Sequence, residues 1–551
     1  MYKKRCCIIF LVFIISFSIL YSKVINLQFK KADELSVIAD SQYMYKENIE
    51  ELNYKLLDCN GKDLLKYNKK YKAVIIPNVF IKNNMDTDYE EFLKLLYTLK
   101  SYDSDYDLTD TKYLNSSQKL YFDIDETTYE KLKEIKGIRG FYIFAYSQVD
   151  RSEAWKIENI ITNPKNSNDN NFKHKDSLEM SIYNNVKQNR IPQIEFNIDM
   201  DGNIKEGKKS ILDNNKNVRL TLDKDLQEEI KAILNSKYNK YEQIGVILME
   251  SNTGKIKAMV QKDDTLPNVN IGAETLNGFF PGSIFKTIVL EGVLENNNIS
   301  LQDNFICKGN YENTKNKEVR GHGELTVEEA FTVSCNDVYS QLGIKVGAEK
   351  INELSEKQGL FEKVLGLDRE QKGALEIKDP KLQDGSLAIT SIGQNMRITP
   401  IEAISIVNTV VNKGTYVKPN IIDGYIDVNN KEIEKINREQ HEVLSNSTAN
   451  EVKEIMKRVV NNGTGRAAKI QGAEVGGKTG STERIEIVKN KENKNEKREY
   501  SDGWFTGYFK HNDKYYSMVV FVKDIDKNSE SGGSTAAPIF KDIAEKVIKN
   551  K

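Results

Sequence analysis

The chain has 551 residues, more than one ordinary hydrophobic core holds, so two to four domains are expected. Hydrophobic residues make up 39% of the chain, which is enough for globular folding. Lys+Arg 80 and Asp+Glu 81 nearly cancel to a net charge of -1, which excludes a general attraction to nucleic acid.

The cysteines and histidines show no closely spaced metal-ligand pattern. The five cysteines include no CxxC pair with a downstream partner, and the four histidines include no HExxH arrangement. The sequence therefore predicts neither a structural zinc site nor a metalloenzyme.

The N-terminus carries the pattern of a membrane anchor. Three basic residues at 3–5 precede an apolar run over 6–21, which Val24 and Ile25 extend. The positive flank predicts a short cytoplasmic tail over 1–5, a transmembrane signal anchor over 6–25, and the rest of the chain outside the cytoplasm. A signal peptide cleaved near Ser16-Phe17-Ser18 is the alternative.

The region from about 26 to 216 is expected to form a separate extracytoplasmic domain. Residues 71–77 predict a strand, and residues 129–138 are apolar at helical spacing. Residues 161–176 are dense in Asn, Lys, Asp and Ser, which predicts a loop or linker.

The pattern changes near Asn217. We expect strands at 218–222, 244–249 and 255–260, a helix over 226–234 capped by Asp223, mainly helices over 283–411, strands at 502–508 and 515–522, and a last helix over 538–549. The charged stretch 489–499 predicts a solvated loop between strands. This order indicates an α+β fold with an antiparallel sheet, flanking helices and a helical subdomain.

Two short motifs in this region suggest nucleophilic catalysis. In Ser283-Ile-Phe-Lys286, helical spacing places the hydroxyl and the amine on one face, where a desolvated lysine can activate the serine. In Ser334-Cys335-Asn336, which follows a capping box at Thr326, the hydroxyl can relay a proton and the amide can bind a substrate amide. Alone, each motif is more often a solvated helix face or a helix cap.

The third motif is Lys478-Thr479-Gly480-Ser481, after two glycines. Glycines allow a strand to lie close to a ligand, the lysine adds positive charge, and Thr479 and Ser481 can bind a carboxylate. A Gly-rich hairpin or a phosphate-binding loop is the alternative, because Gly472, Gly477, Lys478 and Thr479 match the GxxxxGK[ST] spacing.

The order SxxK, SxN, KTG resembles the signature of the penicillin-binding and serine β-lactamase superfamily. Further segments resemble its transpeptidase domain and extend the resemblance over about 217–551. They are 220–227, 254–258, His322-Gly323, Gly393-Gln394, Thr399-Pro400, 502–505, Gly532-Gly533 and Ala537-Pro538.

The first half resembles the pedestal of class B, monofunctional penicillin-binding proteins. The segment 57–62 is similar to an element that follows the anchor in that class, although Cys59 replaces its usual arginine. The resemblance implies an elongated α+β pedestal, similar to a dimerisation domain, over 26–216 and a transpeptidase domain over 217–551.

The resemblance implies acyl transfer on peptidoglycan stem peptides ending in D-Ala-D-Ala. Ser283 would attack the penultimate carbonyl, Lys286 would accept its proton, and Ser334 would pass a proton to the departing D-Ala. An amine from a neighbouring strand would then resolve the acyl-enzyme and form the cross-link.

The other roles also come from the resemblance. Asn336 and Lys478 complete the catalytic set, and Thr479, Gly480 and Ser481 bind substrate. β-Lactams would acylate the serine, no cofactor or metal is implied, and the cytoplasmic membrane is the expected location. A membrane glycosyltransferase partner is left open, and nucleic acid is not expected.

Other functions remain alternatives: a β-lactamase or a D,D-carboxypeptidase of the same superfamily, or a non-catalytic cell-wall scaffold. Asn336 favours a transpeptidase over oxacillin-hydrolysing β-lactamases, and intact motifs disfavour a scaffold. Cys307 and Cys335 also raise the hypothesis of a disulfide that acts as a redox switch on activity, with two independently packed thiols as the alternative.

Overall fold

In the computed structural model, the chain forms two compact units that interleave along the sequence. The structure describes residues 2–25, 44–84, 87–114, 118–166, 169–198, 203–210, 214–296, 298–311, 321–489 and 495–549. The first unit comprises residues 1–53, 66–150 and 189–213, and the second comprises 54–65, 151–188 and 214–551. The expected single boundary at 217 thus differs from the observed division, because two earlier segments pack with the C-terminal unit.

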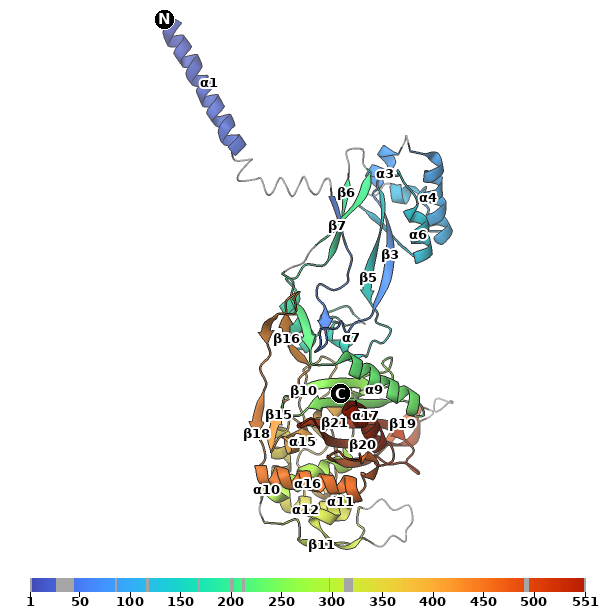
Figure 1. The fold of residues 1–551 in the computed structure, drawn as a ribbon, viewed down its shortest axis with the longest axis vertical. Coiled ribbons are helices and arrows are strands. Elements are labelled where there is room, and N and C mark those ends of the chain that lie inside the picture. The colour runs from blue at the N-terminus through green and yellow to red at the C-terminus, as the bar shows by residue number, and fades with distance from the viewer. Residues whose placement is uncertain are drawn as a thin grey trace. The chain divides into compact units, whose positions relative to one another are not determined.

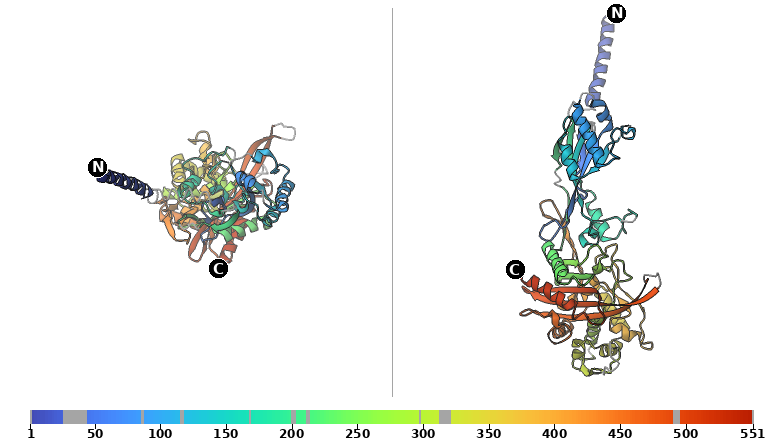
Figure 2. Two further views of the ribbon diagram at one scale, coloured as in Figure 1. Left: turned by 90° about the horizontal axis from the view of Figure 1, so that it is seen from above. Right: turned by 90° about the vertical axis from the view of Figure 1, so that its right-hand side faces the viewer.

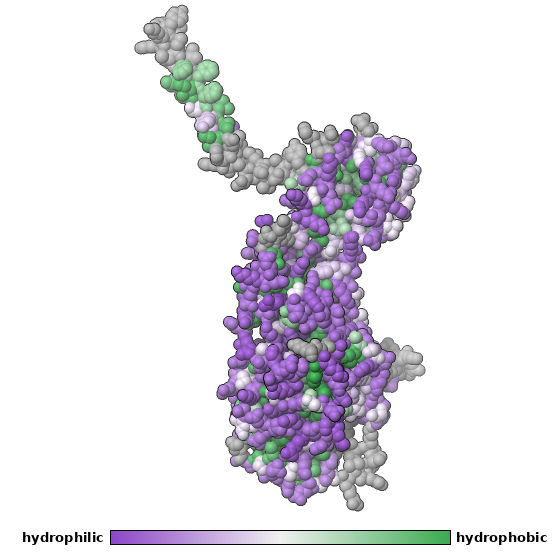
Figure 3. All heavy atoms as spheres, in the orientation of Figure 1, coloured by the Kyte–Doolittle hydropathy of each residue, from purple (hydrophilic) through white to green (hydrophobic). Residues whose placement is uncertain are grey.

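The N-terminal segment is a single helix, α1 (Tyr2–Ile25). Its large apolar side chains from Phe10 to Ile25 are exposed, as the green surface of this helix in Figure 3 shows. Among the residues that the structure describes, no helix is long and apolar enough to cross a membrane.

The first unit also contains two small sheets. One has the order β4-β3-β5, with β3 at Tyr67–Ile75, β4 at Leu120–Ile124 and β5 at Phe141–Val149. The other has the order β1-β6-β7, with β1 at Met44–Asn48, β6 at Gln193–Ile198 and β7 at Ile204–Lys209. The strand predicted at 71–77 is present as part of β3, which ends at Ile75, because α3 begins at Pro77.

Helices pack against one face of β4-β3-β5 through a common apolar core. They are α3 (Pro77–Asn83), α4 (Tyr89–Tyr102), α5 (Thr111–Leu114) and α6 (Glu126–Lys133). The helix expected over 129–138 begins earlier, because Asp125 caps it by accepting the Thr128 amide. The chain turns away from the helix towards Gly137, which has a φ of 74°.

A five-stranded antiparallel sheet forms the centre of the second unit (Figure 1). Its order is β10-β9-β21-β20-β19, with β9 at Ile244–Glu250, β10 at Lys255–Gln261, β19 at Val475–Lys489, β20 at Asn495–His511 and β21 at Lys514–Ile525. The predicted antiparallel α+β arrangement is confirmed. The charged stretch is not wholly a loop, because pairing of β19 with β20 continues out to Lys489 and Asn495.

Helices cover both faces of this sheet (Figures 1 and 2). On one face, α9 (Lys224–Lys237) and α17 (Ala536–Lys549) bury Leu234, Phe540 and Ile543 against the strands. As predicted, Asp223 caps α9 by accepting the Leu226 amide.

The other face carries the helical subdomain, which confirms the helices expected over 283–411. Its helices are α10 (Lys286–Glu295), α11 (Val327–Thr332), α12 (Asn336–Val346), α13 (Ala348–Lys357), α14 (Ser386–Ser391), α15 (Pro400–Val411) and α16 (Asn446–Asn462). Helix α15 is buried along its whole length, so it is the core element of this layer.

Shorter elements complete the second unit. A four-stranded sheet has the order β17-β16-β8-β2, with β2 at Leu56–Leu57, β8 at Asn217–Leu220, β16 at Ile422–Ile426 and β17 at Glu432–Lys435. Helices α7 (Ile157–Ile161) and α8 (Leu178–Val186) flank the predicted loop at 161–176. Three strand pairs are also present: β11 (Asn304–Cys307) with β12 (Gly323–Thr326), β13 (Ala374–Leu375) with β14 (Met396–Arg397), and β15 (Thr415–Val417) with β18 (Gln440–Glu442).

Candidate active site

Ser283 lies in a tight turn at the start of α10. Gly282–Phe285 form a 3₁₀ turn, η3, and regular α-helix begins at Lys286, so the helix predicted to begin at Ser283 is 3₁₀ over its first turn. Gly282 has a φ of 54°, and its amide donates to the Gly393 carbonyl at 3.0 Å. This turn leaves the Ser283 side chain only half-buried, where a substrate can reach it.

Lys286 joins the first motif to the second. Its side chain is fully buried, and its ammonium nitrogen donates to the Ser334 carbonyl and to Asn336 Oδ1, both at 2.6 Å. Ser334 Oγ is a third acceptor at 3.4 Å. The Tyr339 ring lies 5.8 Å from the nitrogen, within cation–π range. The lysine is therefore held at a defined point beside the second motif.

Ser334 occupies a strained turn between α11 and α12. Its φ is 61°, a left-handed conformation that costs a residue with a Cβ about 1–2 kcal/mol. The expected capping box at Thr326 and Glu329 is present at the start of α11. Non-glycine residues persist in such conformations when their surroundings demand them, often at functional sites.

Asn336 is the first residue of α12, and its side-chain amide makes two hydrogen bonds. Its Oδ1 accepts from Lys286, and its amide nitrogen donates to the Tyr311 carbonyl at 2.8 Å. Because the lysine can only donate, the contact fixes which amide atom faces it.

Lys478 enters the same site from β19. Its nitrogen donates to Ser334 Oγ at 2.8 Å and to the Thr479 carbonyl at 3.1 Å, and its side chain is fully buried. Burial holds the pKa of Lys478 well below its usual value, and the charge of Lys286 lowers it further. One serine hydroxyl thus receives hydrogen bonds from two buried lysines.

The rest of the third motif lies against the turn that contains Ser283. A Cβ added at Gly480 would stand 2.8 Å from the Pro281 carbonyl, and one added at Gly282 would stand 2.8 Å from the Ser481 carbonyl. Only glycines allow this close approach of β19 to the turn. The structure therefore brings the three sequence-predicted motifs together at one edge of the central sheet.

The hydroxyls of the third motif have partners that the sequence did not identify. Thr479 Oγ1 lies 2.7 Å from Thr464 Oγ1, and Ser481 Oγ accepts the Gly532 amide at 3.0 Å. The sequence indicates Gly532 only through its resemblance to the family. Thr464 follows α16 in a Gly-Thr-Gly sequence, and its only signal is that turn-forming pattern.

This arrangement fits acyl transfer through a serine. Buried lysines can take up a proton when they are neutral, a hydroxyl between them can carry one, and helix and strand amides near Ser283 can stabilise an oxyanion. A protonated lysine at this position also suits an anionic substrate group.

Comparison with known proteins agrees with this geometry. The family model "Penicillin binding protein transpeptidase domain" matches residues 244–545. The chain is 30% identical over 350 residues to "Stage V sporulation protein D" of Bacillus subtilis, which covers 59% of this chain and 52% of that protein. It is 24% identical over 379 residues to "Peptidoglycan D,D-transpeptidase FtsI homolog" of Mesostigma viride, which covers 61% of each.

A solved structure supports the fold over almost the whole chain. It is described as "a peptidoglycan synthetase from Bifidobacterium adolescentis", and it covers 92% of this chain and 96% of its own with a TM-score of 0.63 and 17% identity. The chain spans less than two thirds of the length of the two curated relatives named above. The matched family model extends from the first central strand to the last helix, more than half of the residues, and the chain therefore belongs to the penicillin-binding protein transpeptidase family.

Proposed function

We propose that this protein is a peptidoglycan D,D-transpeptidase that cross-links stem peptides through an acyl-enzyme on Ser283. The observation that carries the proposal is the Ser334 hydroxyl, which receives Lys478 at 2.8 Å and Lys286 at 3.4 Å. An acyl transfer needs a proton to leave the nucleophile and to reach the departing amine, and this shared hydroxyl supplies such a route.

In the proposed reaction, Ser283 Oγ bonds to the penultimate D-Ala carbonyl carbon and its proton passes to a neutral lysine amine. The C–N bond to the terminal D-Ala then breaks, and Ser334 passes a proton to that nitrogen. Amides near Ser283 and Ser481 stabilise the oxyanion. A second stem-peptide amine attacks the ester, forms the cross-link and returns Ser283 to its free form.

Substrate binding is assigned to the edge of the central sheet. Thr479 and Ser481 present hydroxyls beside Lys478, a set that suits the terminal carboxylate of D-Ala-D-Ala. Asn336 is placed to bind a substrate amide. β-Lactams, which resemble the same dipeptide, are expected to acylate Ser283.

The first experiment is covalent labelling with a fluorescent penicillin. Wild-type protein should form one stable adduct per chain, and Ser283→Ala should form none while keeping its thermal unfolding temperature. Peptide mapping should place the adduct on Ser283. A stable adduct on the Ser283→Ala protein would contradict the proposed nucleophile.

A second experiment separates the activities of the superfamily. With a pentapeptide donor and an amine acceptor, a transpeptidase releases D-Ala and forms a cross-linked product. Release of D-Ala without cross-linking would indicate a carboxypeptidase, and rapid turnover of the penicillin adduct would indicate a β-lactamase.

We further propose that the chain acts at the outer face of the cytoplasmic membrane, anchored by its N-terminal segment. The exposed apolar side chains of α1 and the basic residues at 3–5 support this placement. Protease added to intact spheroplasts should then digest the catalytic unit, and N-terminal sequencing should begin near Met1. A mature N-terminus near Ile19 would show a cleaved signal peptide instead.

A further inference from the structure

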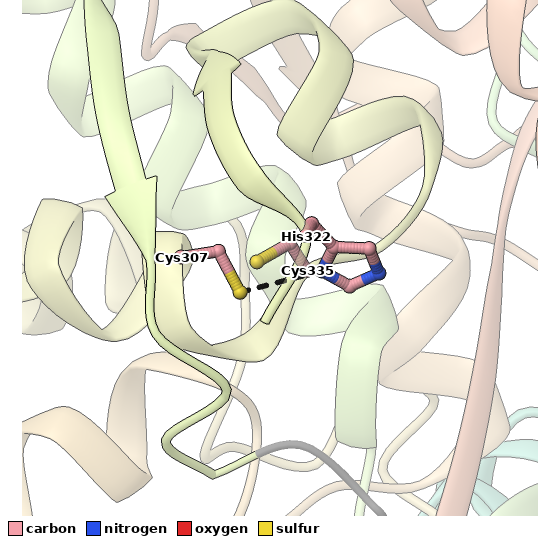
Figure 4. A group of neighbouring side chains, drawn as sticks. All are labelled: Cys307, His322 and Cys335. Atoms are coloured by element: carbon pink, nitrogen blue, oxygen red, sulfur yellow. Dashed lines mark hydrogen bonds between the residues drawn. The ribbon is translucent and has the colours of Figure 1, made fainter. Parts of the chain in front are cut away.

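Two cysteines and a histidine converge beside the SxN turn (Figure 4). Cys307 ends β11, His322 immediately precedes β12, and Cys335 is the N-cap of α12. Their ligand atoms all lie within 4.8 Å of one another, and Cys307 Sγ is 3.3 Å from His322 Nδ1. Neither cysteine is in a disulfide.

The atoms of this cluster suit one class of ion. Thiolate sulfur and imidazole nitrogen select Zn²⁺ and other soft or borderline metals over Mg²⁺ and Ca²⁺. Around tetrahedral Zn²⁺, bonds of about 2.3 Å to sulfur and about 2.0–2.1 Å to nitrogen place two sulfurs about 3.8 Å apart and sulfur and nitrogen about 3.6 Å apart. The observed spacing needs shifts of about 1 Å or less to meet this geometry.

We propose that Cys307, His322 and Cys335 form a binding site for one thiophilic divalent cation, with Zn²⁺ as the ion whose ligand preference fits. Both sulfurs are buried, whereas His322 is exposed, so a solvent molecule can supply the fourth ligand from the histidine side. The sequence predicted no metal site because the ligands are not closely spaced: 15 residues separate the first two, and 13 (335 minus 322) the last two.

The backbone around the cluster allows the three side chains to approach one another. A Cβ added at Gly321 would stand 2.1 Å from the Cys307 carbonyl, so only glycine lets the chain bring His322 to this sulfur. The Val338 amide donates to Cys335 Sγ at 3.4 Å at the positive end of α12.

A bound cation would position the second catalytic motif. Cys335 stands between Ser334, which receives both buried lysines, and Asn336, which receives Lys286. The backbone after Cys307 already contacts this turn, because amides of Lys308–Asn310 donate to Asp337 at 2.6–3.2 Å. A metal bond from the β11–β12 pair to Cys335 would lock Ser334 in its left-handed conformation.

A disulfide between Cys307 and Cys335 is the competing use of the same sulfurs. It would exclude the metal, because both sulfurs would lose the thiolate charge with which cysteine binds a cation. The histidine favours the metal, since a disulfide has no need of an imidazole 3.3 Å from one of its sulfurs. The experiment therefore measures metal and disulfide together.

The test uses the full-length chain, purified in detergent without chelator and under mild reduction. Elemental analysis should find one Zn²⁺ per chain, and replacement by Co²⁺ should give thiolate-to-metal charge-transfer and tetrahedral d–d bands. Cys307→Ser, Cys335→Ser and His322→Ala should each weaken metal affinity by at least about 100-fold. Matched controls are Cys59→Ser and His174→Ala, which lie outside the cluster and should keep one metal.

Wild-type protein from which a chelator has removed the metal tests the site without any substitution, so the result does not depend on whether the variants fold. Adding Zn²⁺ back should raise its unfolding temperature and restore the penicillin acylation rate, and Co²⁺ should restore the bands. Metal content below about 0.1 per chain after Zn²⁺ addition, content unchanged in all three variants, or a Cys307–Cys335 disulfide in the active protein would each overturn the site.

This test is separate from that of the proposed function. Ser283→Ala should still bind one metal, because Ser283 is not a ligand. A protein that binds metal through the three residues and never reacts with penicillin would refute the transpeptidase proposal and leave the metal site standing.

Discussion

Ser334 is the residue on which the candidate site depends most directly. Its carbonyl and hydroxyl both accept hydrogen bonds from buried lysines, and its φ of 61° turns them towards those lysines. The Cβ of Ser334 makes the left-handed backbone unfavourable, whereas its hydroxyl accepts the hydrogen bonds of the lysines. Substitutions can therefore separate the two effects.

Ser334→Gly should lower the penicillin acylation rate as much as Ser334→Ala does, roughly 10²–10⁴-fold, because both remove the hydroxyl between the lysines. The glycine variant should nevertheless be the more stable of the two by about 1 kcal/mol, since only glycine adopts this φ without strain. Stopped-flow acylation and urea unfolding measure the two quantities. Equal stability of the variants would contradict the strain argument.

The two lysines predict how acylation depends on pH. The pKa of Lys478 is held well below its usual value by burial and by the charge of Lys286. A lysine with a lowered pKa is neutral above that pKa and takes up a proton as the pH falls through it. The acylation rate should therefore be flat at high pH and fall by about tenfold per pH unit below the apparent pKa of the pair.

The measurement is the acylation rate of wild-type protein across pH, with circular dichroism at each pH to confirm that the chain stays folded. An acylation rate that falls towards high pH instead of low pH would show that a protonated lysine is the reactive form. The Lys286→Ala rate, expected to be lower by roughly 10²–10⁴-fold, gives the baseline without that amine.

At the scale of elements, the turn that contains Ser283 is held by close backbone contacts. The 3₁₀ turn η3 lies between β19 and the Gly393 segment after α14, and each contact is made by a glycine. Because these contacts leave no room for an added Cβ, small changes there should move the Ser283 hydroxyl relative to the other two motifs.

Gly393→Ala should reduce acylation by about 100-fold, since the new Cβ would stand 2.0 Å from the Gly282 carbonyl and must displace the turn. Gly472→Ala is the matched control. Gly472 has a similar φ, 80° against 78°, but nothing lies within 4 Å of its added Cβ. The control should lose about 1–2 kcal/mol of stability and keep its acylation rate. Similar rates for both variants would exclude the steric argument.

For the whole molecule, the second unit extends beyond the region that resembles a transpeptidase domain. Strand β2 pairs with β8, the buried Gln227 donates to Glu158 Oε1 at 2.5 Å, and Asp58 accepts the Lys224 amide at 3.1 Å. In each contact, one partner belongs to a segment that precedes residue 217.

A fragment of residues 217–551 should therefore unfold at a lower temperature than the full chain and label poorly with penicillin. Loss of one buried hydrogen-bond partner costs about 1–3 kcal/mol, and the fragment also exposes the apolar surface that β2 and α7 cover. The control is residues 44–551, which lack only α1 and the segment after it. This fragment should keep the unfolding temperature of the full chain, and equal temperatures for all three proteins would contradict the prediction.

Much of the architecture could be predicted from local sequence patterns. Residues 244–249 are an apolar run, residues 255–260 contain four apolar residues, and an Asn-Thr-Gly turn lies between them, which together predict the strand pair that forms. Asp223 and Thr326 are capping residues, which predict the helices that follow them. The three motifs were found because their residue types suit acyl transfer and because their order along the chain resembles that of the penicillin-binding family. Where patterns conflicted, as in the charged residues at 495–499, pairing with a neighbouring strand decided the structure.

The sequence by itself determined the motifs, the helix caps and the α+β class, because each depends on residues close together in the chain. Only the tertiary structure decided that Lys286 and Lys478, 192 positions apart (478 minus 286), donate to one hydroxyl. It likewise brought Cys307, His322 and Cys335 within 4.8 Å. Such contacts form across elements, and their distances depend on how helices and strands pack, which no local pattern encodes.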